Sequence, residues 1–286
     1  MRYALFLGCT VPVRGMNYEL SARKVADRLG IELVDIPDFS CCGFPVKSVD
    51  IKTALVLSAK NLALAEKEGL DLVTLCSACA SVLAEANEAL KEDEELRNII
   101  NQELDIPYNG TIEVYHFVRI LWEKVGPQAL KEQITKPLSG IRVGAHYGCH
   151  YIKPSEVYGF DDPENPVSLD VLIEATGAES VWYDRKLHCC GGGILGIEEG
   201  IALAMSKVKL DALKKEGVDA LISICPFCTV MYEGNQRKIE KTFDTKYGIP
   251  VLYYTQLLGL ALGIPPEELG FNLNRVKPKD LLAKIS

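Results

Sequence analysis

Apolar residues recur along the chain with two different spacings. Short continuous apolar runs, which are typical of buried strands, occupy residues 2–8, 31–36, 70–75 and 111–115. Between the first two runs the apolar residues follow the spacing of an amphipathic helix: Tyr18, Ala22, Val25, Ala26 and Leu29. Strands that alternate with helices predict a parallel sheet, because parallel neighbours must be joined by a crossover.

Further helices are expected after the other apolar runs. Asp50 is a residue type that caps helix N-termini, and the apolar positions after it keep a helical spacing as far as Ala65. We also expect helices over residues 78–95 and 117–124. The first half of the chain therefore predicts one α/β domain.

The second half repeats this order of elements. Strands are expected over residues 141–146, 179–183 and 218–224, and helices over residues 168–176 and 198–216. Even the letters repeat, because Glu-Gly-Leu-Asp at residues 68–71 returns as Glu-Gly-Val-Asp at residues 216–219. We predict an α/β fold of two pseudo-symmetric Rossmann-like domains with mainly parallel sheets.

The two domains are expected to cover residues 1–138 and 139–286, with a linker at residues 137–140. Residues 150–166 contain three prolines and are expected to form a loop insertion special to the second half. The tail from Pro265 is expected to wrap over the surface or to form an interface.

The ten cysteines fall into two matching sets of five. In each set a lone cysteine is followed by a Cys-Cys-Gly motif and then by C-x-x-C. The first set is Cys9, Cys41, Cys42, Cys76 and Cys79. The second set is Cys149, Cys189, Cys190, Cys225 and Cys228. Because these residues follow expected strands, whose carboxyl ends meet at one edge of a parallel sheet, we expect one site in each half.

Five thiolates with two adjacent members favour a multi-metal cluster. Adjacent residues in an extended segment point to opposite sides, so they reach two metal atoms more readily than one. A tetrahedral zinc site takes only four ligands. An iron-sulfur cluster fits better, and Gly43 and Gly191–Gly193 would let the backbone pass close to inorganic sulfide and donate N–H groups to it. A lone C-x-x-C would fit a redox dithiol or a zinc knuckle equally well, and unligated cysteines would simply pack in the core.

Length and charge exclude several other classes. At 286 residues, with 48% of them hydrophobic, the chain can bury a large core, while its formal charge of -8 disfavours nucleic-acid binding. No apolar run approaches the roughly 18 residues of a membrane span, so none is expected. The apolar stretch at the start is too short for a secretory signal. We therefore expect a cytoplasmic protein, in a reducing compartment where patterned cysteines serve as ligands.

The doubled arrangement of lone cysteine, CCG and C-x-x-C resembles the CCG-domain family over most of the chain. Within it, the two-domain form is similar to the B component of the coenzyme B–coenzyme M heterodisulfide reductases of methanogens. The resemblance implies two noncubane 4Fe–4S clusters, one for each set of cysteines, and cleavage of a small-molecule disulfide between them. It does not separate this enzyme from electron-transfer relatives linked to succinate, glycolate or glycerol 3-phosphate oxidation.

The motifs that are missing point to an external electron donor. The chain has no ferredoxin-type run of four cysteines, no G-x-G-x-x-G after a strand and no Walker motif. Electrons must then arrive from another polypeptide. The resemblance implies that the direct donor is a ferredoxin-like heterodisulfide reductase subunit, the C component of the complex. It further implies a flavin-containing subunit, the A component, which passes on electrons from a hydrogenase or formate dehydrogenase.

Basic and histidine side chains near the cysteines are candidates for substrate contacts. The heterodisulfide is anionic, so an acidic protein must present cations beside the clusters. Five basic residues lie within a few positions of a cysteine: Arg14, Lys47, Lys153, Arg185 and Lys186. Each is otherwise an ordinary solvated charge. His146, His150 and His188 flank the second set, where a histidine serves either as a proton donor to a product thiolate or as a structural hydrogen-bonding group.

Overall fold

The computed structural model describes residues 1–285 and contains two four-stranded parallel sheets. The first has the order β2-β1-β3-β4 and is built from β1 (Arg2–Phe6), β2 (Glu32–Asp35), β3 (Leu72–Thr74) and β4 (Val114–His116). The second has the equivalent order β6-β5-β7-β8 and is built from β5 (Arg142–His146), β6 (Glu179–Val181), β7 (Ala220–Ser223) and β8 (Val251–Tyr253). The predicted α/β fold with pseudo-symmetric parallel sheets is confirmed.

Helices join the strands of each sheet. In the first half they are α1 (Val11–Arg14), α2 (Met16–Arg28), α3 (Ile51–Lys67), α4 (Ser77–Glu92), α5 (Glu94–Asn101), α6 (Phe117–Ile120) and α7 (Pro127–Gln133). In the second half they are α8 (Cys149–Ile152), α9 (Ser155–Tyr158), α10 (Ser168–Ala175), α11 (Glu199–Glu216), α12 (Pro226–Thr229), α13 (Gln236–Thr242), α14 (Tyr254–Ala261) and α15 (Lys279–Lys284). Short π-helical segments, Leu121–Val125 and Val230–Gly234, extend α6 and α12.

Three sequence-based expectations differ from the structure. The helix expected over residues 78–95 breaks at Asp93, because the Asp93 carboxylate accepts from the Leu96 N–H at 2.9 Å and starts a second helix. The segment 150–166 is not a plain loop, since it contains most of α8 and all of α9. Strand β8 was not among the expected strands.

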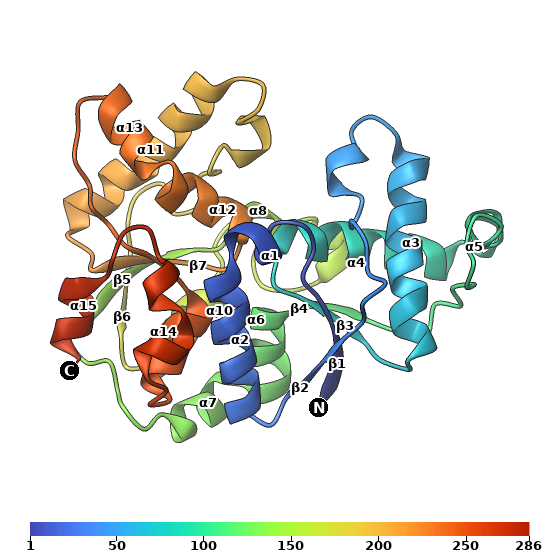
Figure 1. Cartoon of the computed structure of the whole chain (residues 1–286), viewed down its shortest axis with the longest axis horizontal. Coiled ribbons are helices and arrows are strands. Elements are labelled where there is room, and N and C mark those ends of the chain that lie inside the picture. Colours follow the sequence, from blue (N-terminus) through green and yellow to red (C-terminus); the bar gives the residue numbers. More distant parts are fainter. Residues whose placement is uncertain (286) are drawn as a thin grey trace.

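Helices of one half pack against helices of the other across their boundary. Figure 1 shows α2 of the first half beside α14 of the second, and α10 of the second half packs in turn on α7 of the first. The rings of Tyr18 and Tyr253 stack with centroids 4.0 Å apart, and the hydroxyls of Ser21 and Thr255 lie 2.6 Å apart. Each of two hydrophobic core clusters therefore contains residues of both halves. The division at residue 138 stays a prediction.

The tail after α14 folds back onto the first half. The Asn17 side-chain amide donates to Asn274 at 3.2 Å, and Lys24 pairs with Glu268 at 2.5 Å. Leu269 and Phe271 are buried in the shared core. Within residues 1–285, no helix combines the length and the apolar character needed to cross a membrane.

Candidate functional site

Every cysteine lies in a connection that leaves the carboxyl end of a strand or in the first turn of the helix that follows. Cys76 and Cys225 precede the first residues of α4 and α12, directly after β3 and β7. The CCG motifs lie in the equivalent connections, β2 to α3 and β6 to α11. Because parallel strands end at one edge of a sheet, this topology brings each set of five together.

The CCG turn is built in the same way in both halves. Gly43 and Gly191 have φ angles of +93° and +79°, in the left-handed region that side chains avoid. A Cβ at Gly43 would lie 2.6 Å from the Ala54 carbonyl oxygen, and one at Gly191 would lie 2.9 Å from that of Ala202. Glycine is therefore required where the turn meets the following helix.

Side-chain hydrogen bonds fix the CCG backbone as well. Ser58 of α3 donates to the Cys42 carbonyl at 2.8 Å, and Ser206 of α11 donates to the Cys190 carbonyl at the same distance. The Gly43 N–H approaches the Cys41 sulfur at 3.4 Å, and in the second half the glycine N–H groups approach sulfur at 3.3–3.4 Å. Backbone donors thus face the thiols, as a bound anionic sulfur group requires.

The two sets of thiols meet at the boundary between the halves. The thiols of Cys76 and Cys225 lie close enough to shift each other's pKa, that of Cys76 upward and that of Cys225 downward, and both side chains are buried. Thiols that shift the pKa of their neighbours form one row, in the order Cys41, Cys42, Cys79, Cys76, Cys225, Cys228, Cys190, Cys189 and Cys149. Cys9 is not part of this row. The side chains of Cys9, Cys149 and Cys189 are exposed. The row is buried at its centre, at Cys76 and Cys225, and exposed at the end formed by Cys189 and Cys149.

Thiol contacts make neighbouring pKa values diverge. Contact with Cys79 lowers the pKa of Cys42 to about 7, whereas the pKa of Cys79 is raised by its contact with Cys42. Contact with Cys149 lowers the pKa of Cys189, and the reverse contact raises the pKa of Cys149. Within these two pairs the thiolate form is therefore favoured at Cys42 and at Cys189. Thiolates are the form that binds metal.

The first half also fixes the position of Cys225. The carbonyl of Ile224, one residue earlier, accepts from the Tyr18 hydroxyl at 3.2 Å and from His116 Nε2 at 3.0 Å. His116 Nδ1 accepts from the Val118 N–H, so Nε2 carries the hydrogen. Burial lowers the pKa of His116 to about 4, which keeps the ring neutral. The boundary of the two halves is thus part of the site.

Several buried polar atoms beside the cysteines lack partners within residues 1–285. They are Ser40 Oγ, Ser77 Oγ, His146 Nε2 and Tyr232 OH. Burying such groups without an acceptor is unfavourable, and native structures rarely do it. An anionic, sulfur-rich group between the thiols would supply acceptors, so the donor set fits an iron-sulfur cluster.

A single metal ion fits the site less well. Among the described residues, no three His, Cys, Asp or Glu side chains converge on one ion position. A multi-iron cluster does not require such convergence, because its thiolates bind different irons.

The five basic candidates occupy different surroundings. Lys47 pairs with Glu85, Arg185 with Asp184 at 3.3 Å, and Lys186 with Asp170 at 2.5 Å. Arg14 and Lys153 are exposed, and no side-chain partner is found for either within the described chain. The site assignment of all five stays a prediction.

A hollow lies near the cysteines in each half. The one in the second half, of about 300 Å³, is lined by Cys149, two lysines, Lys153 and Lys186, and one carboxylate, Glu164, among others. The equivalent hollow in the first half, of about 280 Å³, includes Asp35 and has no lysine or arginine in its lining. An anion would therefore be favoured in the second hollow.

His150 links the second half to the first CCG loop. Its Nδ1 lies 3.2 Å from the Ser81 hydroxyl, which donates to Glu85 at 2.7 Å, and its ring packs edge-on against Phe44. Burial lowers its pKa. His188 instead lies 3.2 Å from an Arg185 nitrogen at the surface.

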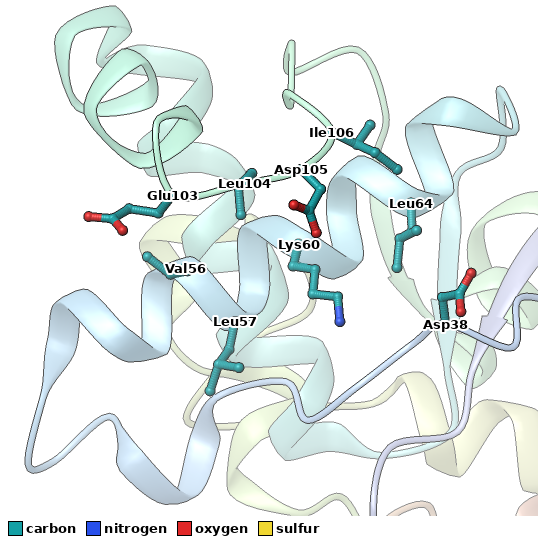
Figure 2. A pocket seen from close by; sticks show the side chains of 9 residues that line it. All are labelled: Asp38, Val56, Leu57, Lys60, Leu64, Glu103, Leu104, Asp105 and Ile106. Carbon is teal, nitrogen blue, oxygen red and sulfur yellow. The ribbon is translucent and has the colours of Figure 1, made fainter.

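A separate hollow lies away from the cysteines. Figure 2 shows it between α3 and the segment after α5, where side chains of both line a space of about 310 Å³. It is lined by Asp38, Val56, Leu57, Lys60, Leu64, Glu103, Leu104, Asp105 and Ile106. None of the ten cysteines contributes, so we do not assign it to this site.

Sequence reasoning missed several residues that shape the site: Tyr18, His116, Lys209, Tyr232 and Tyr253. Lys209 could have been found from the repeat. The serines that bind the two CCG carbonyls are Ser58 and Ser206, and three residues after them stand Asn61 and Lys209. The tyrosines carried no signal of this kind.

Comparison with known proteins supports the same grouping. The cysteine-rich CCG domain matches residues 3–84 and 143–233, which together make up more than half of the chain. The chain is 43% identical, over 99% of its length and 97% of the relative's, to a Methanosarcina mazei protein named as the B component of ferredoxin:CoB-CoM heterodisulfide reductase. It is 35% identical, over 95% and 96% of the two lengths, to a Wolinella succinogenes protein named 8-methylmenaquinol:fumarate reductase membrane anchor subunit.

One solved structure has a similar fold. The crystal structure of a hypothetical protein from Helicobacter pylori matches 96% of this chain with a TM-score of 0.77 and 20% sequence identity. The chain spans 52% of that protein's length. At this level of identity the likeness shows the fold alone.

Proposed function

The chain belongs to the family of CCG cysteine-rich domain proteins, and from this we propose that it is the disulfide-reducing subunit of a CoB-CoM heterodisulfide reductase. It is an iron-sulfur oxidoreductase. The observation that carries the proposal is the row of thiols, which runs through both halves and meets at Cys76 and Cys225. Two equivalent sites in contact suit a substrate whose two halves must each receive an electron.

We assign one noncubane 4Fe–4S cluster to each set of cysteines. The first would be held by Cys9, Cys41, Cys42, Cys76 and Cys79, and the second by Cys149, Cys189, Cys190, Cys225 and Cys228. Such clusters supply one-electron transfer to and from a bound sulfur compound. The chain's own contribution is to hold the thiolates, to exclude water at Cys76 and Cys225, and to donate N–H groups from the CCG turns.

Iron and sulfide analysis tests this inventory. Protein purified without oxygen should contain about eight irons and eight sulfides per chain, since each 4Fe–4S cluster holds four of each. Metal analysis by plasma emission on the same sample checks for zinc. One zinc with only four irons would contradict the two-cluster assignment and leave a structural metal in one half.

We propose that Lys153 binds an anionic group of the disulfide. Its ammonium is exposed at the hollow beside Cys149 and has no partner within the described chain, so it is free to pair with substrate. Lys153→Ala should raise KM for the heterodisulfide about tenfold, equal to about 1.4 kcal/mol, with kcat within about twofold.

Steady-state kinetics with a reduced dye measures this effect. Lys131→Ala removes an equally exposed lysine from α7 and should leave both constants unchanged. An unchanged KM in Lys153→Ala would remove this residue from the substrate site.

The electron donors are proposed to be two partner subunits of the same complex. One is ferredoxin-like, and the other contains flavin and is fed by a hydrogenase or formate dehydrogenase. The relative named as one component of a heterodisulfide reductase supports the existence of partner subunits. We also infer a cytoplasmic location, because cysteines at patterned spacing serve as metal ligands in a reducing compartment.

The second candidate is an electron-transfer subunit of another oxidoreductase. The relative named as part of a fumarate reductase, at 35% identity, favours it. The two functions differ in one assay. A disulfide-reducing subunit turns over the heterodisulfide with reduced dye alone, whereas an electron-transfer subunit takes up electrons and leaves the disulfide intact.

A further inference from the structure

The second half buries a lysine close to its cysteines. Lys209 of α11 has no exposed surface, and its ammonium donates to the Lys186 carbonyl at 2.6 Å and to His146 Nδ1 at 2.8 Å. It also lies over the rings of Tyr183 and Tyr232, at 5.8 and 5.7 Å. Within residues 1–285, no carboxylate pairs with it.

A buried cation without a carboxylate needs another negative partner. Four thiols of the second set, those of Cys228, Cys190, Cys189 and Cys149, act electrostatically on Lys209 and favour its charged form. Burial opposes them and lowers the lysine pKa to about 7. The negative partner of Lys209 is therefore the second thiol set and whatever that set holds.

The first half lacks this cation at the equivalent place. Ser58 and Ser206 bind the two CCG carbonyls in the same way, and one turn later stand Asn61 and Lys209. Asn61 is neutral and donates to the Cys41 carbonyl at 3.0 Å. The end of β1 likewise carries Phe6 where the end of β5 carries His146.

Two neighbouring donors lack an acceptor. His146 Nδ1 accepts from Lys209, so its Nε2 carries the hydrogen, and that atom is buried with no partner in the described chain. The Tyr232 hydroxyl is likewise buried without a partner in the described chain. Its ring packs edge-on against that of His146, with the ring centroids 4.9 Å apart. The described part of the first half has unpartnered hydroxyls too, at Ser40 and Ser77, so the buried cation is the difference that favours more negative charge in the second half.

We propose that Lys209, supported by His146, raises the reduction potential of the cluster in the second half above that of the cluster in the first. An added electron makes a cluster more negative, and a buried cation beside it stabilises that charge. An electron from the partner protein then settles first in the second half. This inference rests on the proposed function, because it requires a redox group in each half.

Redox titration of the purified, cluster-loaded chain, followed by electron paramagnetic resonance at one fixed pH, tests the inference. Lys209→Met removes the charge and keeps the length of the side chain. We expect one of the two midpoint potentials to fall by at least 59 mV, which is a tenfold change for one electron, and the other to stay unchanged. The same fall is expected in a Cys42→Ser background, which assigns it to the second half.

Lys207→Met is the matched control. It removes a lysine from the same helix, where the ammonium pairs with Asp211 at the surface, and it should shift neither potential. If Lys209→Met does not fold, His146→Phe, which installs the residue of the first half, should lower the same potential by a smaller amount. Unchanged potentials in a variant with full iron content overturn this inference alone. A wild-type chain without a second cluster overturns the proposed function, and this inference with it.

Discussion

Cys42→Ser and Cys190→Ser should each reduce the heterodisulfide at least about 100-fold more slowly than the wild type with a reduced dye as donor. Loss of a cluster ligand exceeds the 10- to 100-fold effect of losing an outer hydrogen-bond partner. Either variant would also leave one half of the substrate without a site for its electron. Because the two CCG turns are equivalent in geometry, the two losses should be similar.

Turnover assays must be read together with iron content. Val49→Ser, in the exposed loop after the first CCG turn, is a control that should keep full activity. The prediction is contradicted if a variant loses the cluster of the half that carries the substitution, keeps the cluster of the other half and still turns over near the wild-type rate. One site would then suffice, and cleavage between two clusters would be wrong.

Gly43→Ala and Gly191→Ala should destabilise the protein and deplete the cluster of the half concerned. A left-handed backbone costs a residue with a Cβ about 1–2 kcal/mol, and the new methyl would meet the carbonyl of Ala54 or Ala202 at 2.6 or 2.9 Å. The turn must then move away from its helix, and the thiols move with it.

Gly193→Ala is the comparison within the same glycine run. A Cβ there meets nothing within 4 Å, and its φ angle is not positive. Thermal unfolding and iron analysis of the three variants should separate Gly193→Ala from the other two. Equal stability and iron content in all three would show that the turn does not depend on glycine.

Local features of the fold could be predicted because single residues determine them. Asp50 caps α3 by accepting from the Thr53 N–H at 3.0 Å, as its position before the apolar spacing indicated. The parallel direction of the strands follows from their alternation with helices, and the same topology brings together the cysteines beyond the strand ends.

Features that depend on packing between the halves could not be predicted. The contact of Cys76 with Cys225 depends on how Tyr18 and His116 meet the Ile224 carbonyl, and no spacing in the sequence encodes that docking. Lys209 lies in a helix with several other lysines, where burial of one of them depends on the His146 side chain supplied by another strand. Such partners are set by tertiary structure.

The packing of helices of one half against helices of the other also bears on why the two repeats share one chain. The α2–α14 and α10–α7 contacts leave each half with apolar helix faces that only the other half covers. A single copy of the repeat would therefore have to form a homodimer, and its cofactor content would depend on protein concentration. Two copies joined in one chain do not have that dependence. They are also free to acquire different residues, so that one carries Asn61 and the other Lys209.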